Sequence, residues 1–161
     1  MTNPRERTPV WLPPADLARV VELTPLVAID LVVRDASGRM LLGLRSNRPA
    51  QGTWFVPGGR VGKNERLAAA FARISRVELG CELAMSEARP LGVFEHFYDD
   101  NFAGEPDFGT HYVVLAYALT VDPARLALPE REQHGGYLWL SDDEIRGRDD
   151  VHPNSRAYGG R

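Results

Sequence analysis

The stretch that decides the fold is VPGGRVGKNERLAAAFARISRVELG, residues 56–80. A pair of glycines typical of a turn opens it, and residues 65–79 then follow a helical pattern that ends at Gly80. Apolar side chains at three- and four-residue spacing predict a stripe that packs on a sheet: Leu67, Ala70, Phe71, Ile74 and Val77. Arg73 and Glu78 flank this stripe, as is typical of a solvated face. Glu65 falls in the first turn, where a carboxylate caps a helix more often than it catalyses.

Apolar segments on both sides of this helix predict strands. Residues 26–35 and 39–47 have the pattern of a hairpin around a turn at 35–38. Residues 52–59 are expected to form a short strand that ends in the glycine turn, and further strands are expected at residues 90–100, 110–121 and 135–141. A short helix is expected at 15–23. Strands that bracket a central helix, with short helices at the ends, predict an α/β domain with a mixed sheet.

Composition narrows the class of protein. A chain of 161 residues with 43% hydrophobic content suits one domain, and a net charge of -3 with scattered charges predicts no nucleic-acid partner. Cys81 is the only cysteine, which excludes an internal disulfide and is compatible with a reducing cytosol. The first residues contain no apolar signal core, and the run LVAIDLVV is too short to span a bilayer. We therefore expect a cytoplasmic protein without a membrane partner.

The spacing of residues 59–80 resembles the Nudix hydrolase box, a loop, helix and loop that hold a metal diphosphate. The positions in register with that box are Gly59, Glu65, Arg73, Glu78 and Gly80. Two further glutamates of the box are replaced here by Ile74 and Val77. Those carboxylates ordinarily bind metals near a phosphorus under attack, so their replacement argues against ordinary pyrophosphatase chemistry. One hard cation still needs only a few protein oxygens in addition to the substrate phosphates.

A narrower resemblance, to the GDP-mannose mannosyl hydrolases, covers nearly the whole chain. The segments that carry it are LLGLRSNRPAQGTWFVPGGRV (41–61), HFYDDNF (96–102), THYVVL (110–115), EQHGGYLWL (132–140) and VHPNSRAY (151–158). It implies one Nudix domain over residues 1–161, an α/β/α sandwich around a mixed sheet. Residues 1–24 would form an N-terminal arm and short helix in substrate or dimer contacts. The resemblance also implies a homodimer.

This family hydrolyses a GDP-sugar to GDP and free sugar, by attack of water at the anomeric carbon with inversion. Mannose and glucose are both candidate sugars. One Mg²⁺ per subunit, or Mn²⁺, would stabilise the departing diphosphate. The implied metal ligands are the Gly58 carbonyl, Glu78 and Gln133, and the implied base is His134. Without the resemblance, a loop Gln-His pair would carry little weight.

Two arginines are candidates for the diphosphate, because a guanidinium fork suits phosphate oxygens. Arg45 ends a predicted strand, and Arg60 follows the glycine pair. Each could instead be an ordinary surface arginine. Arg60 is also counted as catalytic, because it would stabilise the charge on the leaving group.

Asp30 interrupts the apolar run LVAIDLVV, where an unpaired carboxylate is costly. Either it pairs with an arginine and orders the sheet, or it lines the sugar pocket and takes part in catalysis. The resemblance puts His96 and Tyr112 beside it, although each could be an ordinary strand or core residue. It also counts Trp11, Leu12 and Leu17 among the substrate contacts. The indole of Trp11 would stack on guanine or, equally, pin a proline-rich arm onto the domain.

Two other functions remain open from the sequence. One is a conventional Nudix diphosphatase that attacks phosphorus, against which Ile74 and Val77 argue. The other is a non-catalytic sugar-nucleotide sensor, against which the joint retention of Glu78, Gln133 and His134 argues.

Overall fold

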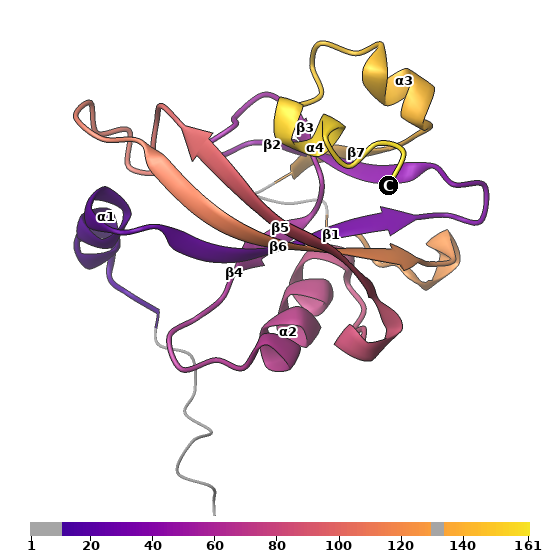
Figure 1. The fold of residues 1–161 in the computed structure, drawn as a ribbon, viewed down its shortest axis with the longest axis horizontal. Coiled ribbons are helices and arrows are strands. Elements are labelled where there is room, and N and C mark those ends of the chain that lie inside the picture. Colours follow the sequence, from indigo (N-terminus) through magenta and orange to yellow (C-terminus); the bar gives the residue numbers. More distant parts are fainter. Residues whose placement is uncertain (1–10, 130–133) are drawn as a thin grey trace, which may run out of the picture.

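Strand β1 (Leu26–Arg34) lies at the centre of the sheet in the computed structural model, which describes residues 11–129 and 134–161 (Figure 1). β2 (Met40–Arg45) folds back antiparallel to β1 through the predicted turn, and β6 (Thr110–Thr120) runs parallel to β1 on its other side. The other strands pair antiparallel with β1, β2 or β6, and they are β3 (Trp54–Phe55), β4 (Gly58–Arg60), β5 (Arg89–Tyr98) and β7 (His134–Leu140). The predicted mixed sheet is confirmed.

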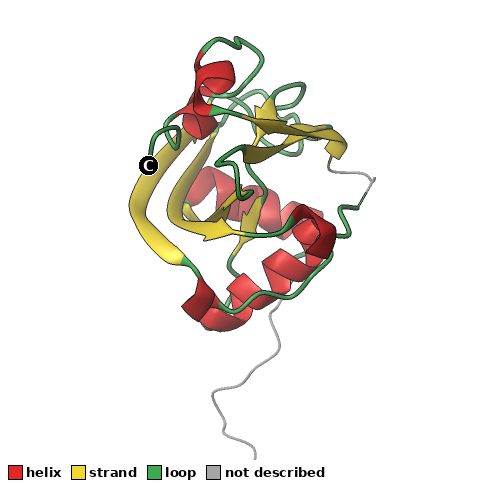
Figure 2. Cartoon of the chain, turned by 90° about the vertical axis from the view of Figure 1, so that its right-hand side faces the viewer, coloured by secondary structure: helices red, strands yellow, loops and turns green. Residues whose placement is uncertain are grey.

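Helices cover both faces of this sheet (Figure 1 and Figure 2). α2 (Leu67–Leu79) lies on one face, and the short helices α3 (Asp142–Arg146) and α4 (Pro153–Arg156) lie on the other. α1 (Pro14–Leu23) contacts β6, and two short 3-10 helices, η1 (Met85–Glu87) and η2 (Pro123–Arg125), follow α2 and β6. The α/β/α sandwich expected from the sequence is therefore present.

β1 separates two apolar cores, because its alternate side chains point to opposite faces of the sheet. The core on the α2 side contains Ile29 and Leu31 of β1 together with Phe71 of the helix. The core on the α4 side contains Val32, Met40, Phe55, Ile145 and Tyr158. Burial on both faces explains why the sequence of β1 is apolar on either side of Asp30.

Helix α2 differs from the prediction in its start and in the face that it buries. It begins at Leu67, so Glu65 precedes the helix instead of lying in its first turn. Leu67 and Val77, which were predicted to pack, are 39% and 54% exposed. Glu78 is buried and not on a solvated face, because the buried residues of the helix are Ala70, Phe71, Ile74, Ser75, Glu78 and Leu79. This face is centred near Phe71 and Glu78, which leaves Val77 on the flank and Leu67 at the open first turn.

The predicted stop at Gly80 is confirmed, and it yields a stability prediction. Gly80 has a φ of 68°, and a Cβ there would lie 2.0 Å from the carbonyl oxygen of Ala127. Gly38 has a φ of 82°, but nothing lies within 4 Å of its Cβ position. Gly38→Ala should therefore cost only the left-handed backbone strain, about 1 kcal/mol in free energy of unfolding. Gly80→Ala should cost clearly more, as urea unfolding of both variants will measure; equal losses would contradict a role for the Ala127 contact.

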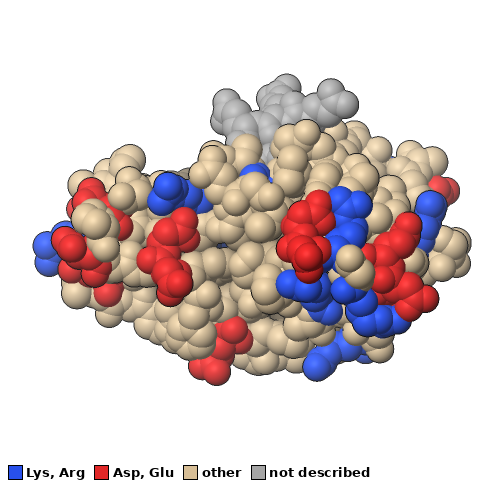
Figure 3. Space-filling model, turned by 90° about the horizontal axis from the view of Figure 1, so that it is seen from above, with Lys and Arg blue, Asp and Glu red and all other residues tan. Residues whose placement is uncertain are grey.

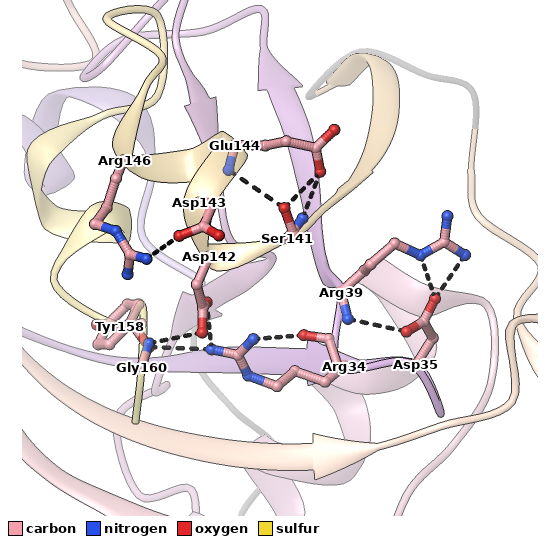
Figure 4. A network of polar contacts seen from close by, with 11 residues as sticks. Arg34, Asp35, Arg39, Ser141, Asp142, Asp143, Glu144, Arg146, Tyr158 and Gly160 are labelled. Atoms are coloured by element: carbon pink, nitrogen blue, oxygen red, sulfur yellow. Dashed lines mark hydrogen bonds and ion pairs between the residues drawn. The ribbon is translucent and has the colours of Figure 1, made fainter.

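A polar network ties the C-terminal segment to β1 (Figure 4). The Arg34 guanidinium donates to Oδ1 of Asp142 at 3.0 Å and to the carbonyl oxygen of Tyr158 at 3.3 Å. The other Asp142 oxygen accepts from the N–H of Gly160 at 3.0 Å. This network fixes the backbone around Tyr158, whose side chain is fully buried against the sheet.

The surface charges are mixed in sign. On the face that carries α3 and α4, basic and acidic side chains lie next to one another (Figure 3). The ion pairs of the structure include Arg34–Asp142 and Arg148–Asp150. Among the residues that the structure describes, no helix is both long enough and apolar enough to cross a membrane.

Candidate active site

One pocket beside β4 gathers residues from six strands, β1 to β6. Its volume is about 80 Å³, and it is lined by six of the residues predicted for the site: Asp30, Arg45, Gly58, Arg60, His96 and Tyr112. The sheet registers bring these distant positions together, because Asp30 lies opposite Gly58 and His96 lies opposite Tyr112.

Asp30 is buried in this pocket, with 5% of its surface exposed. Its Oδ2 accepts a hydrogen bond from the Tyr158 hydroxyl at 2.8 Å, so the structure gives it a tyrosine partner where the sequence suggested an arginine. Burial raises the pKa of Asp30 to about 7, although the Tyr158 hydrogen bond and the charge of Arg45 both act to lower it. A pocket carboxyl that titrates near neutral pH is typical of functional sites.

Gly58 allows the backbone to approach the Asp30 side chain closely. A Cβ at position 58 would lie 2.6 Å from Oδ1 of Asp30 and 2.7 Å from the carbonyl oxygen of Ile29. The glycine pair was expected as a turn, but Gly58 and Gly59 belong to β4 and pair with β1. The expectation of a turn is thus wrong, because the missing side chains serve close strand packing here.

Tyr158 also links Asp30 to His96. Its hydroxyl lies 3.5 Å from Nε2 of His96, which is 4% exposed. The direction of this contact depends on which ring nitrogen of His96 carries the proton. Burial lowers the pKa of His96 to about 4, and the charge of His152 adds to this effect. His96 is therefore neutral near pH 7.

The Gly58 carbonyl fits its expected part as a metal ligand. The ladder between β1 and β4 bonds Leu31 to Pro57 and Val61 to Val27. Gly58 falls at the alternate position opposite Asp30, where backbone groups of an antiparallel strand point away from the neighbour. The Gly58 carbonyl is therefore not used by this ladder.

Glu78, the expected carboxylate ligand, lies on the helix face that meets β4. It is 6% exposed and follows Ile74 by four residues, so the two side chains share one face of α2. Ile74 contacts β4, because a Cβ on Gly59 would lie 3.1 Å from its side chain. Within residues 11–129 and 134–161, no group of three or more His, Cys, Asp or Glu side chains is arranged to hold a metal ion. A single carboxylate with a backbone carbonyl suits the oxygen preference of Mg²⁺ or Mn²⁺.

Glu65 stabilises the segment between β4 and α2. Its two carboxylate oxygens accept from Arg73 at 2.7 and 2.8 Å, and one also accepts from the N–H of Gly62 at 2.7 Å. The hydrogen bond from Arg73 is the main cause of the lowered pKa of Glu65. Arg73 in turn donates to the carbonyl oxygen of Arg60 at 2.8 Å. These contacts give Glu65 a structural role, but not the helix cap that the sequence favoured, because α2 begins at Leu67 and its N-cap makes no side-chain hydrogen bond.

Arg45 and Arg60 lie where the first pocket meets a second, larger one of about 510 Å³. Both pockets share Arg45, Pro49, Arg60 and Tyr112. Arg45 is oriented by donating from Nε to the Pro49 carbonyl oxygen at 3.0 Å. Two guanidinium groups at such a junction suit a diphosphate that spans both pockets.

The N-terminal residues predicted to contact substrate line a third pocket of about 220 Å³, which contains Trp11, Leu12, Leu17 and Arg60. The Trp11 ring lies 5.0 Å from the Arg73 guanidinium and 5.9 Å from that of Arg60. Such cation–π contacts favour the alternative in which Trp11 pins the N-terminal arm onto the domain. Leu17 lines the second pocket as well.

Two predicted site residues lie wholly or partly outside the described part of the chain. Gln133 lies outside the described residues, and so does the side chain of His134. The backbone of His134 opens β7 and lies in register opposite Arg45 of β2. The backbone of the predicted base therefore lies beside Arg45, which lines the pocket.

The NUDIX domain model matches residues 24–158, most of the chain. This protein belongs to the Nudix family. Agl8 of Haloferax volcanii, a low-salt glycan biosynthesis protein, is 41% identical over 126 residues, which cover 78% of each chain. The MutT NUDIX hydrolase of Burkholderia pseudomallei has a TM-score of 0.66 at 25% identity, over 83% of this chain and 95% of that one. The NUDIX domain of Shewanella oneidensis NrtR, solved with ADP ribose, shares the fold, with a TM-score of 0.58 at 15% identity over 87% and 90%.

Sequence reasoning missed two tyrosines in the pocket region of this Nudix protein. Tyr98 lines the pocket, and its ring is nearly perpendicular to that of Tyr112, 6.2 Å away. Tyr158 holds Asp30 across 128 sequence positions. Both residues lie in segments that carry the family resemblance, HFYDDNF and VHPNSRAY. A tyrosine within such a segment was the sequence signal that could have indicated a site residue.

Proposed function

We propose that this Nudix protein hydrolyses GDP-mannose, and GDP-glucose, to GDP and free sugar. The proposed form is a homodimer with one Mg²⁺, or Mn²⁺, per subunit, as the sequence resemblance implies. The Gly58 carbonyl, Glu78 and Gln133 would hold the divalent cation. When bound, it would neutralise the charge that builds on the diphosphate.

The observation that carries this proposal is the contrast between the two sides of β4. On the α2 side, Ile74 packs against Gly59 at 1% exposure, and Val77 points to solvent, so neither offers a carboxylate to a phosphorus atom. On the other side, Asp30, His96 and the two arginines converge on one pocket. The polar groups are thus concentrated where a sugar and its diphosphate link would lie.

In the proposed reaction, a water molecule attacks the anomeric carbon from the side opposite GDP. The bond between that carbon and the diphosphate oxygen breaks, and its electron pair leaves with GDP. His134 accepts the proton of the water, and the single displacement inverts the sugar. Arg45 and Arg60 stabilise the charge on the diphosphate, while Asp30 and the neutral His96 offer polar groups to the sugar.

The named relative supports a sugar-nucleotide substrate. Agl8 is described as a glycan biosynthesis protein, and glycan assembly draws on activated sugars. At 41% identity over 126 residues, the likeness extends well beyond the Nudix box.

Oxygen labelling tests which bond is broken. With GDP-mannose and Mg²⁺ in ¹⁸O-water, the label is expected in the free sugar and absent from GDP. Label in a nucleotide or sugar phosphate would establish attack at phosphorus, and binding of GDP-mannose without turnover would establish a sensor. Parallel assays with GDP-glucose and GDP-fucose will define the sugar preference.

Glu78→Gln is expected to weaken Mn²⁺ binding by at least about tenfold and to lower turnover, because it removes the one anionic ligand of the proposed set. Glu65→Gln is the matched control: Arg73 and Gly62 already occupy its carboxylate, so it should reduce stability more than metal affinity. Titration of both variants with Mn²⁺ provides the measurement. Unchanged Mn²⁺ affinity in Glu78→Gln would reject Glu78 as a ligand.

A further inference from the structure

The second pocket has the size of a small-molecule site, about 510 Å³, and lies directly beside the first. Arg45 and Arg60 line its border with the smaller pocket, and Arg48 adds a third guanidinium. One wall of the pocket is apolar and is formed by Leu17, Val21 and Leu26 from α1 and the start of β1. Polar side chains of the β2–β3 connection also line the pocket: Ser46, Asn47 and Gln51. A ligand that spans the arginine border would therefore extend along this apolar wall.

Phe102 is the aromatic residue that the segment between β5 and β6 contributes to this pocket. It is 39% exposed, although a phenylalanine of this size is ordinarily buried. Its neighbour Asn101 is fully buried. The Asn101 amide donates to the carbonyl oxygens of Glu105 and Phe108 at 2.9 and 2.7 Å, and its oxygen accepts from the N–H groups of Ala103 and Glu105 at 3.1 and 3.2 Å.

These four hydrogen bonds fix the shape of the segment that carries Phe102. An ion pair between Arg48 and Asp100, at 3.8 Å, also joins this segment to the β2–β3 connection on the rim of the pocket. The pair is exposed and adds little stability, but it shows that the two connections lie side by side. Phe102 is thus an exposed apolar ring on an ordered support, an arrangement suited to stacking at low entropic cost.

The tryptophan expected to stack on guanine lies elsewhere. Trp11 lines the third pocket and not the second, and its ring contacts the guanidinium groups of Arg73 and Arg60. The predicted base contact and the apolar end of the second pocket are therefore different places.

We propose that the second pocket binds the nucleobase of a nucleoside diphosphate, with the base stacked on Phe102 beside the apolar residues of α1. The diphosphate then lies along the arginine border, and the group attached to it enters the smaller pocket. This inference rests on the proposed function, because it takes a nucleoside diphosphate sugar as the substrate, and it identifies the residue that holds the base.

Calorimetric titration of the full chain with GDP and with inorganic pyrophosphate, both with Mg²⁺, tests the proposal. Phe102→Ala and Phe102→Leu should raise the Kd for GDP by roughly five- to a hundredfold, the range of an aromatic–base stack. The Kd for pyrophosphate should stay unchanged, and Phe102→Tyr should bind GDP as the native protein does. Phe102→Leu separates the aromatic face from mere apolar bulk.

Phe97→Ala is the matched control, because Phe97 is 66% exposed on β5 and stacks on His111, outside the second pocket. The proposal would be overturned if Phe102→Leu and Phe97→Ala had the same Kd for GDP. It would also be overturned if Phe102→Leu lost as much affinity for pyrophosphate as for GDP. Both measurements are made without sugar or turnover.

If Phe102 governs GDP affinity but GDP-mannose is not hydrolysed, the base site stands and the proposed reaction fails. If GDP-mannose is hydrolysed while Phe102 has no effect on GDP affinity, only the base site fails.

Discussion

Replacing His134 with glutamine is expected to lower the turnover number for GDP-mannose by roughly a hundredfold to ten-thousandfold, the usual cost of losing a general base. The KM should change little, because a group that only accepts the proton of water does not bind the ground state. His134 opens β7 opposite Arg45, so its backbone lies beside a residue of the pocket. The measurement is a pH profile of turnover at saturating metal.

The shape of that profile decides between two candidate bases. A histidine base acts only when its imidazole is neutral, so native turnover should fall at acid pH. Asp30 would produce a similar acidic limb, because burial raises its pKa to about 7. If His134 is the base, the limb should disappear in His134→Gln and persist in Arg60→Ala, which should instead weaken substrate binding and slow the departure of GDP. A limb that persists in His134→Gln would move the role of base to Asp30.

The elements of the sheet could be predicted because their signals are local. Apolar alternation located the hairpin of β1 and β2, and the residues of β5, β6 and β7, to within a few positions. The end of α2 at Gly80 follows from the left-handed φ that glycine tolerates. That Gly58 and Gly59 form a strand could not be predicted, because it depends on their pairing with Asp30 and Ile29 of β1.

The candidate site was predictable only in part, because its decisive contacts are long-range. Of the six predicted pocket residues, Gly58, His96 and Tyr112 followed from the family resemblance, whereas Asp30, Arg45 and Arg60 were also indicated by their own sequence context. The partner of Asp30 was not predicted, since Tyr158 reaches it from the C-terminal end through a segment held by Arg34 and Asp142. Likewise, the helical spacing of α2 predicted that Val77 packs on the sheet. The position of the sheet instead buries Glu78 and leaves Val77 exposed.

Replacing Asp30 with asparagine is expected to lower turnover and, at the same time, to stabilise the fold at pH 8. Burial raises the pKa of Asp30 from 3.8 to about 7, so the folded state keeps a proton that the unfolded chain releases between these pH values. The contribution of Asp30 to stability is therefore full below about pH 4, falls as the pH rises and levels off above about pH 7. Three pH units at roughly 1.4 kcal/mol each give a loss of up to about 4 kcal/mol. Asparagine avoids this loss and still accepts the hydrogen bond from Tyr158.

Urea unfolding of both proteins at pH 4, 6 and 8, in the presence of a chelator, measures this difference. Asp35→Asn is a control of opposite sign. Burial acts to raise the pKa of Asp35, but hydrogen bonds from Ser37 and Arg39 outweigh it and lower the pKa to about 2. The stability that Asp35 contributes is present above pH 3.8 and is lost as the pH falls toward 2, so Asp35→Asn should be less stable than the native protein at pH 8.

The comparison of the two variants tells a functional carboxyl from a structural one. A charge that weakens the fold at the working pH, and whose removal also lowers turnover, is retained for its chemistry. If Asp30→Asn instead proves less stable than the native protein at pH 8, the hydrogen bond from Tyr158 must outweigh the cost of burying the ionised carboxyl. Asp30 would then order the sheet, as the structural alternative from the sequence holds, with tyrosine in place of arginine.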